Sequence, residues 1–205
     1  MAKSILLVIA GCNGAGKSSF SSVIVPDTVT PFDYDKHFLN YYNSKSDSDL
    51  RELMSHNQTR ELLDESVKEA LAKKLDFCYE TNFNADPFYW PNIFQKEGYE
   101  LRMIYFCLDS MMEAKNRVRI RYENGGHFVP DHEVDERFNQ GYLNLDNFFD
   151  KFDNVDLFNS SHYNKTPEHI ISLSKGKITA IGQIPKFLEK ILPKISNIIR
   201  LKLNQ

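Results

Sequence analysis

The chain has 205 residues, of which 41% are hydrophobic and 26% are charged, a composition that suits one globular domain with a sizeable core. Its formal net charge is −3, which leaves no excess of positive charge for a polynucleotide backbone and makes nucleic acid a disfavoured partner. The apolar runs are too short to span a bilayer or to form the core of a signal peptide. Together with three cysteines that form no CxxC pair, this predicts a cytoplasmic protein with no membrane partner.

The first predicted strand, at 6–10, runs directly into Gly-Cys-Asn-Gly-Ala-Gly-Lys-Ser at 11–18. This octapeptide fits GxxxxGK[ST], a loop whose backbone N–H groups turn inward onto phosphate oxygens. Lys17 supplies a positive charge for the β- and γ-phosphates, and the Ser18 hydroxyl can coordinate Mg²⁺. Residues 18–24 can open a helix whose N-terminus faces the anion. The sequence therefore favours a nucleoside triphosphate site over a glycine-rich turn without a ligand. Its predicted residues are Gly11, Cys12, Asn13, Gly14, Ala15, Gly16, Lys17, Ser18 and Ser19.

Further apolar runs suited to buried parallel strands follow at 77–79, 101–108 and 155–158, with a weaker run that ends at Asp35. Helical patterns lie between them, at 49–74 with a break near His56, at 86–98 with Asp86 as N-cap, at 110–125 behind a capping box, and from Asp131 onward. Strands that alternate with helices indicate a parallel sheet with ligands at the carboxyl ends of its strands. The prediction is an α/β fold, the three-layer sandwich of P-loop nucleoside triphosphatases around a five-stranded, mainly parallel sheet.

The C-terminal part, 170–205, follows a different pattern. A hairpin is predicted at 170–180, and an amphipathic helix, kinked by Pro193, at 186–203. We expect this helix to dock on its own domain rather than on a membrane or a partner. We expect all 205 residues to form one kinase domain with a lid region at about 117–137.

Two acidic residues are predicted to face the nucleotide. Asp35 would end the second strand, where a carboxylate can orient an acceptor hydroxyl and accept its proton. The alternatives are that Asp35 caps the next helix or that Asp33 takes the role. Glu80 follows the apolar run 77–79 and can hold a Mg²⁺-bound water or a substrate hydroxyl, the alternative being a pair with a neighbouring cation. Asp109 is similar to a Walker B aspartate, but we interpret it as structural because a helix start lies beside it.

Cations for the migrating phosphate are predicted in the lid region. Arg117 and Arg121 lie four residues apart on one helix face. A glycine-containing break at 124–127 then suits a lid that closes over ATP. Arg137, on the next predicted helix, can reach the same phosphates from the opposite side of the nucleotide site. For any single arginine, a solvated basic face is the alternative.

Taken together, these motifs resemble those of the zeta toxin family of P-loop kinases. The matching segments appear in family order at 11–18, Asp35, 80–83, 117–123, 125–130 and 157–160. The resemblance implies an ATP-dependent kinase that phosphorylates a sugar hydroxyl of UDP-N-acetylglucosamine, with Asp35 as general base and Arg121 as a phosphate clamp. It also implies that Glu80 contacts substrate or Mg²⁺, that Asn159 lies near the adenine end, and that an antitoxin protein is a candidate partner.

The chain departs from the family pattern at a second phosphate-clamping arginine, which aligns best with His127. His127, Arg117 or Arg137 must then provide that charge, and a neutral histidine would weaken the clamp near pH 7. Other functional classes fit less well. A GTPase would need NKxD, which fails at Pro167, and an ABC-type ATPase would need an LSGGQ-like signature, which is absent. The remaining alternative is a P-loop enzyme that acts on another nucleotide or on a nucleic-acid end.

Overall fold

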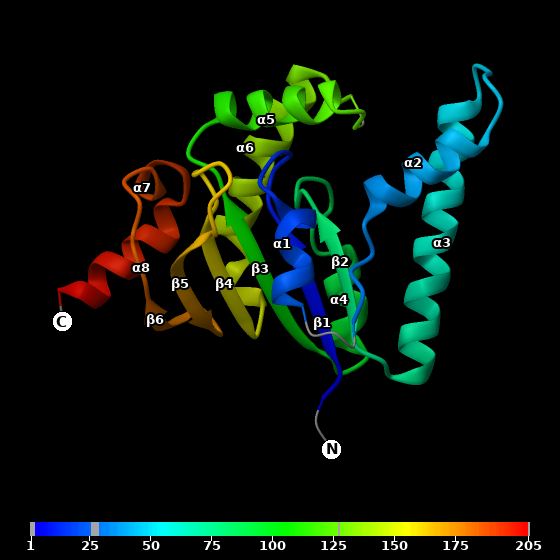
Figure 1. Ribbon diagram of the computed structural model, residues 1–205. Coiled ribbons are helices and arrows are strands. Elements are labelled where there is room, and N and C mark those ends of the chain that lie inside the picture. The colour runs from blue at the N-terminus through cyan, green and yellow to red at the C-terminus, as the bar shows by residue number, and fades with distance from the viewer. Residues whose placement is uncertain (1–2, 26–28, 127, 205) are drawn as a thin grey trace.

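The computed structural model describes residues 3–25, 29–126 and 128–204. Figure 1 shows a central sheet with α1 in front, α4 and α6 behind, and α5 across the top. The strands are β1 (Ile5–Ala10), β2 (Phe77–Thr81), β3 (Glu100–Cys107), β4 (Asn154–Asn159), β5 (Glu168–Ser174) and β6 (Lys177–Ile181). The helices are α1 (Lys17–Ile24), α2 (Tyr34–Ser44), α3 (Arg51–Lys73), α4 (Tyr89–Lys96), α5 (Met111–Glu123), α6 (Asp131–Phe148), the 3-10 turn η1 (Phe149–Lys151), α7 (Leu188–Ile191) and α8 (Pro193–Leu203).

The sheet has six strands in the order β2-β1-β3-β4-β5-β6, rather than the predicted five. β1 pairs in parallel with β2 and β3, and β3 pairs in parallel with β4. The predicted C-terminal hairpin is confirmed, and it adds β5 and β6 in antiparallel fashion. The mixed α/β sandwich expected from the sequence is therefore present, with its parallel strands grouped at one side of the sheet.

The expected strand that ends at Asp35 is wrong. Only an isolated bridge forms there, between Phe32 and Tyr79, and α2 already begins at Tyr34. The physical reason is a local cap: the Asp33 side chain accepts a hydrogen bond from the Lys36 N–H at 3.1 Å and so favours a helix start over extended backbone. Asp35 consequently lies in the first turn of a helix.

Several predicted helix boundaries are confirmed and others are shifted. Ser110 caps α5 by accepting from the Glu113 N–H, as predicted, and α5 ends before Gly125, which has φ 86°. The predicted break near His56 is absent, since α3 runs unbroken from Arg51 to Lys73. The other shifts are that α4 has Phe88 rather than Asp86 at its N-cap, that α6 is preceded by Pro130, and that the C-terminal helix is split into α7 and α8, with Pro193 as the first residue of α8.

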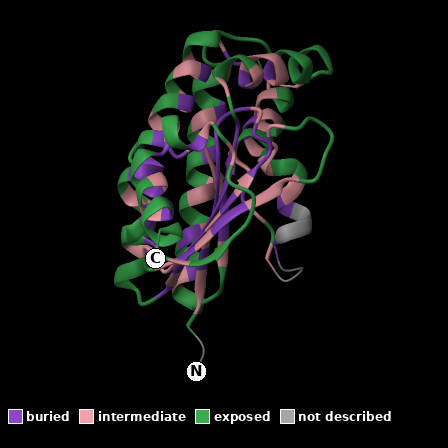
Figure 2. Cartoon of the chain, turned by 90° about the vertical axis from the view of Figure 1, so that its left-hand side faces the viewer, coloured by how far each residue is buried: buried purple, intermediate pink, exposed green. Residues whose placement is uncertain are grey.

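The buried core follows the parallel strands, as the purple stretches in Figure 2 show. Side chains on both faces of β1 and β3 are buried, because helices cover both faces of these strands. Examples are Leu6, Val8, Tyr105 and Phe106. This packing fixes the carboxyl ends of β1, β2 and β3 relative to one another. Among the described residues, no helix is both long enough and apolar enough to cross a membrane.

Candidate functional site

The phosphate-loop motif connects β1 to α1 with the backbone shape that its glycines predict. Gly11, Gly14 and Gly16 have φ angles of 146°, 78° and 84°, values that residues with a Cβ rarely adopt. A Cβ built on Gly11 would lie 2.6 Å from the Phe106 carbonyl oxygen. The loop therefore depends on glycine both for its turns and for its close approach to β3.

Lys17 lies across its own loop. Its Nζ donates to the carbonyl oxygens of Gly11 at 2.7 Å and Cys12 at 3.2 Å, and to Asn82 Oδ1 at 2.9 Å. Burial lowers the pKa of Lys17, while the nearby carboxylates of Asp35 and Glu80 act in the opposite direction. Asn82 was missed by the sequence analysis as a site residue, although it follows Glu80 within the motif matched at 80–83.

Ser18 lies between two carboxylates. Its Oγ is 2.7 Å from Glu80 Oε2 and 3.1 Å from Asp33 Oδ2. Burial raises the pKa of Glu80, and the hydrogen bond from Ser18 opposes that rise. Hydroxyl and carboxylate oxygens are the donors that Mg²⁺ prefers, so these three side chains fit that ion. In the part of the chain that the structure describes, no group of three or more His, Cys, Asp or Glu side chains is placed to hold a metal by itself.

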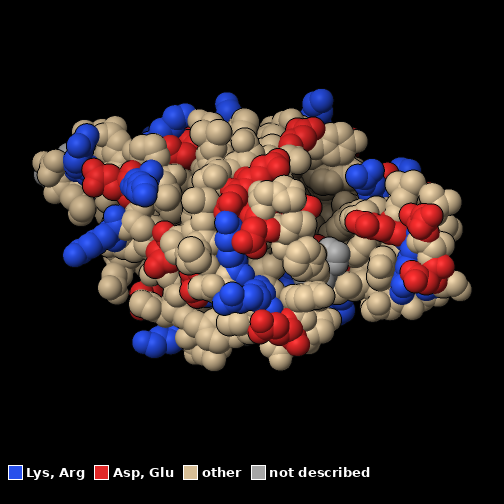
Figure 3. Space-filling view, turned by 90° about the horizontal axis from the view of Figure 1, so that it is seen from above, with Lys and Arg blue, Asp and Glu red and all other residues tan. Residues whose placement is uncertain are grey.

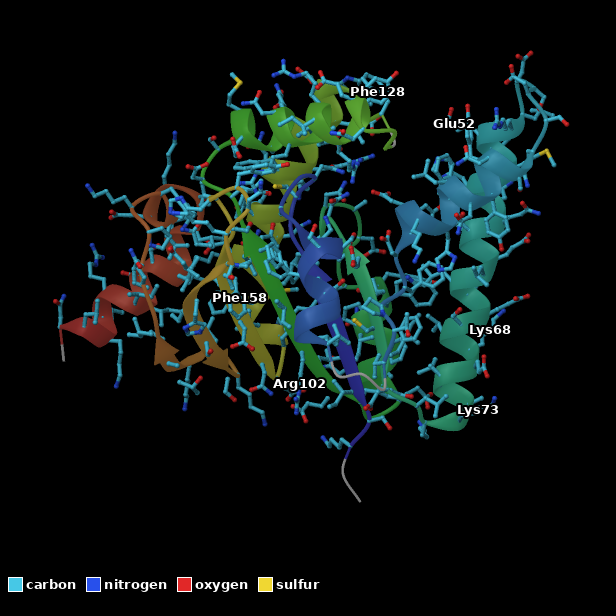
Figure 4. All side chains as sticks on the ribbon, in the orientation of Figure 1. Glu52, Lys68, Lys73, Arg102, Phe128 and Phe158 are labelled. Carbon is cyan, nitrogen blue, oxygen red and sulfur yellow. The ribbon has the colours of Figure 1, made fainter. Side chains whose placement is uncertain are left out.

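Asp35 and Arg121 meet across the opening above the loop. Asp35 Oδ2, from α2, lies 3.9 Å from Arg121 Nη1, from α5, and the two side chains are 50% and 43% exposed. Viewed from above, Figure 3 shows a hollow between the projecting part of the molecule formed by α2 and α3 and the rest. Figure 4 labels Glu52 and Phe128 on the two sides of this opening. Both side chains of the pair are thus accessible from solvent.

The Arg117 guanidinium is bound by other parts of the protein. Its Nη1 donates to the carbonyl oxygens of Ser160 at 2.9 Å and Gly14 at 3.3 Å, its Nη2 donates to the Ser161 carbonyl at 2.7 Å, and its Nε donates to Glu113 Oε1 at 2.6 Å. Arg117 thus lies beside the phosphate loop, but its nitrogens are occupied by protein oxygens.

The remaining predicted residues lie on other sides of the loop. Arg137, on α6, donates to Asn13 Oδ1 at 3.3 Å and to Glu133 Oε2 at 2.5 Å, so it contacts the phosphate loop. Asn159 is buried at the end of β4 and accepts from the Ser161 N–H at 3.1 Å. His127 lies outside the described residues.

A comparison with protein families gives one assignment. The model described as zeta toxin matches residues 2–165. This chain belongs to the zeta toxin family. The match extends from the first strand through β4 and the serines after it, so it includes every site residue named above. Zeta toxin family proteins are kinases with an ATP-binding fold, which agrees with the phosphate loop described here. A search of curated protein sequences finds no match.

Solved structures support the same fold for this zeta toxin family chain. The PezAT chromosomal toxin–antitoxin system of Streptococcus pneumoniae matches with a TM-score of 0.62 and 11% identity, over 100% of this chain and 87% of that one. The AvrRxo1-ORF1:-ORF2 complex with ATP matches with a TM-score of 0.68 and 14% identity, over 93% and 64% of the two chains. The Pnkp1/Rnl/Hen1 RNA repair complex gives a TM-score of 0.55 and 19% identity, over 72% and 47%. This chain therefore spans less than two thirds of the matched chains in the last two structures.

Proposed function

We propose that this zeta toxin family protein transfers the γ-phosphate of ATP to an alcohol group of a small molecule, with UDP-N-acetylglucosamine as the preferred acceptor. The observation that carries the proposal is the approach of Asp35 to Arg121, 3.9 Å apart beside the phosphate loop. A carboxylate and a guanidinium at that place supply the two groups that transfer to a hydroxyl requires, a proton acceptor and a clamp for the phosphate charge.

In the proposed reaction, Asp35 accepts the proton of the acceptor hydroxyl, while the oxygen of that hydroxyl forms a bond to the γ-phosphorus. The bond from that phosphorus to the β-γ bridging oxygen breaks, and ADP leaves with the electron pair. Lys17 moves from the carbonyls of its own loop onto the β- and γ-phosphates, and Arg121 turns to the transferring group. Arg137, which already reaches Asn13 of the loop, supplies a further positive charge. The protein thus works by position and electrostatics, without a covalent intermediate.

The ion for this reaction would be Mg²⁺, held by Ser18 and Glu80 with Asp33 beside them. When bound, it neutralises part of the charge of the β- and γ-phosphates. The close approach of the Ser18 hydroxyl to both carboxylates, at 2.7 and 3.1 Å, supports this assignment. A second use for Glu80 within the same proposal is a hydrogen bond to the acceptor.

The proposed substrate and partner draw support from the motif resemblance and from the solved neighbours. The resemblance of the motifs to zeta toxins supports a nucleotide sugar as acceptor, and the AvrRxo1 complex with ATP supports ATP as donor. Because the Streptococcus pneumoniae neighbour belongs to a toxin–antitoxin system, an antitoxin protein is a candidate partner for this chain. An adjacent gene whose product copurifies with this chain would support that part of the proposal.

Incubation with labelled ATP, magnesium and a panel of nucleotide sugars, other nucleotides and 5′-hydroxyl oligonucleotides tests the proposal. We expect label on UDP-N-acetylglucosamine, and Asp35→Asn should lower the rate by about a hundredfold or more because general-base catalysis typically contributes a factor of 10² to 10⁴. Asp109→Asn is the matched control, since Asp109 is exposed and the structure records no hydrogen bond or ion pair between its carboxylate and the described residues. Undiminished transfer by Asp35→Asn would refute its role, and label on the oligonucleotide alone would favour the nucleic-acid alternative.

A further inference from the structure

The guanidinium of Arg117 joins three separate segments of the chain. Its hydrogen bonds run to Gly14 in the phosphate loop, to Ser160 and Ser161 after β4, and to Glu113 one turn earlier on α5. Each of its three nitrogens has at least one protein acceptor, and the side chain is only 9% exposed. An arginine with this many charge-assisted bonds and so little exposure is fixed in place rather than free to follow a ligand.

The segments that Arg117 joins lie on two sides of the predicted nucleotide site. Gly14 is in the middle of the phosphate loop, and a Cβ built on it would lie 3.0 Å from the Ala114 carbonyl oxygen, so α5 packs directly on the loop. Ser160 is anchored to the end of β3, because its N–H and its Oγ donate to the Cys107 carbonyl at 2.9 and 3.1 Å. Arg117 therefore connects the phosphate loop to the segment after β4.

The connection also orients a backbone amide of the loop. In a trans peptide the carbonyl of one residue and the N–H of the next point in opposite directions. The Gly14 carbonyl is held outward by Arg117, and the following N–H, that of Ala15, points back into the loop, where it donates to the Cys12 carbonyl at 3.2 Å. Fixing the outer oxygen thus fixes the direction of an inward N–H group.

Arg121 differs from Arg117 in its exposure to solvent and in its contacts. Its side chain is 43% exposed, and its recorded ion pair is the 3.9 Å contact with Asp35. If Arg117 turned toward a phosphate, the carbonyls of Ser160 and Ser161 would lose their donor, and such a loss is costly for partly buried groups. Arg121 can turn without that loss.

We propose that Arg117 is a positioning residue for nucleotide binding, which holds Gly14 of the phosphate loop in register with Ser160–Ser161. In this role it acts through those backbone groups and does not contact the transferring phosphate. The inference rests on the proposed function, because the nucleotide is taken to be ATP, and it adds that Arg117 is not the second phosphate clamp. That leaves Arg137 as the described residue for the clamp.

The test compares Arg117→Ala, Arg117→Lys and the control Arg119→Ala in the full chain. Arg119 lies on the same helix, is exposed, and donates only to Asn116 at 3.4 Å among its recorded bonds. We expect Arg117→Ala to raise the Kd and the KM for ATP by about 10- to 100-fold with kcat changed less than about threefold, because its contacts are the same in the ground and transition states. Arg117→Lys should lose part of the ATP affinity, since a compact ammonium group cannot reach all the oxygens that the guanidinium bonds. Arg119→Ala should match the parent.

Calorimetry with ATP and magnesium gives the Kd, ATP-consumption kinetics give KM and kcat, and thermal melting checks that each variant is folded. A fall in kcat of a hundredfold at unchanged Kd would overturn the inference, because it would mean that Arg117 contacts the transferring phosphate. Unchanged values for both would overturn it as well. If Arg117→Ala does not fold, Arg117→Lys and Glu113→Gln carry the test, and parent-like Kd values in both refute the role. Failure of the parent to bind ATP would instead refute the proposed function itself, and the role of Arg117 with it.

Discussion

Replacing Asn144 by alanine should destabilise the protein and loosen the loop that holds Asn82. Asn144 is buried on α6, and its Nδ2 donates to the carbonyl oxygens of Phe83 at 2.9 Å and Asn84 at 2.8 Å. Phe83 has a φ of 58° and is almost fully buried, a conformation that needs support from its surroundings. The loop that brings Asn82 to Lys17 is thus held from behind by one amide group.

The magnitude follows from those two bonds. Asn144→Ala leaves one buried and one partly buried carbonyl without this donor, and each such loss costs about 1–3 kcal/mol, so we expect a loss of about 2–6 kcal/mol of unfolding free energy. For a chain of this size, each kcal/mol shifts Tm by about 2–4 °C. Asn147→Ala is the matched control on the same helix, because Asn147 is exposed and accepts only from Lys194 Nζ. Its expected loss is within about 0.5 kcal/mol.

Urea unfolding followed by circular dichroism measures both variants, and calorimetry with ATP measures the effect on the loop. The ATP affinity of Asn144→Ala should fall as well, since the Asn82 contact to Lys17 becomes less well ordered. A stability within 0.5 kcal/mol of the parent, with the Asn147→Ala value as reference, would refute the reasoning that Asn144 supports this loop.

Three further outcomes are expected from the same structure. Gly11→Ala should abolish ATP binding in calorimetry, because its Cβ would lie 2.6 Å from the Phe106 carbonyl oxygen. Burial raises the pKa of Glu80, so the folded state binds more protons there and the parent should lose stability, relative to Glu80→Gln, as the pH rises from 4 to 7 in urea titrations. Asp146→Ala should cost about 1–3 kcal/mol and speed proteolysis of α8, because both carboxylate oxygens accept from the Lys194 N–H at 3.1 and 3.0 Å.

Each of these outcomes has a contrary result. ATP binding by Gly11→Ala at parent affinity would mean that the loop can move away from β3. A stability difference between parent and Glu80→Gln that stays constant with pH would mean that burial does not perturb that carboxyl group. Equal proteolysis rates for parent and Asp146→Ala would mean that α8 is held by its apolar face alone.

The parts of the site that depend on a contiguous segment could be predicted from the sequence. The phosphate loop has its predicted form because glycines at fixed spacing specify the backbone directly, and the Ser110 cap follows from a four-residue pattern. The predicted strand ending at Asp35 was wrong because the apolar residues before Asp35 suggested extended backbone. Asp33 is a residue type that favours the start of a helix, and this preference was given too little weight.

Contacts between distant segments could not be predicted in the same way. Nothing in the spacing of the arginines says that Arg117 bonds to carbonyls 43 and 44 positions away while Arg121 faces Asp35. Backbone carbonyls carry no sequence signal, since every residue has one. Asn82 illustrates the same limit, because its meeting with Lys17 depends on the parallel pairing of β1 with β2.

Helix α6 contacts the site at several positions along its length, and this restricts insertions and deletions within the helix. Arg137 reaches Asn13, a Cβ on Gly141 would lie 2.7 Å from the Asn82 carbonyl oxygen, and Asn144 holds the turn beyond it. One added or deleted residue rotates everything beyond it by about 100°. A single-residue indel between 137 and 144 would therefore turn at least one of these contacts toward solvent, whereas the β5–β6 turn at 175–176, with Lys175 exposed, can change length without rotating any group at the phosphate loop.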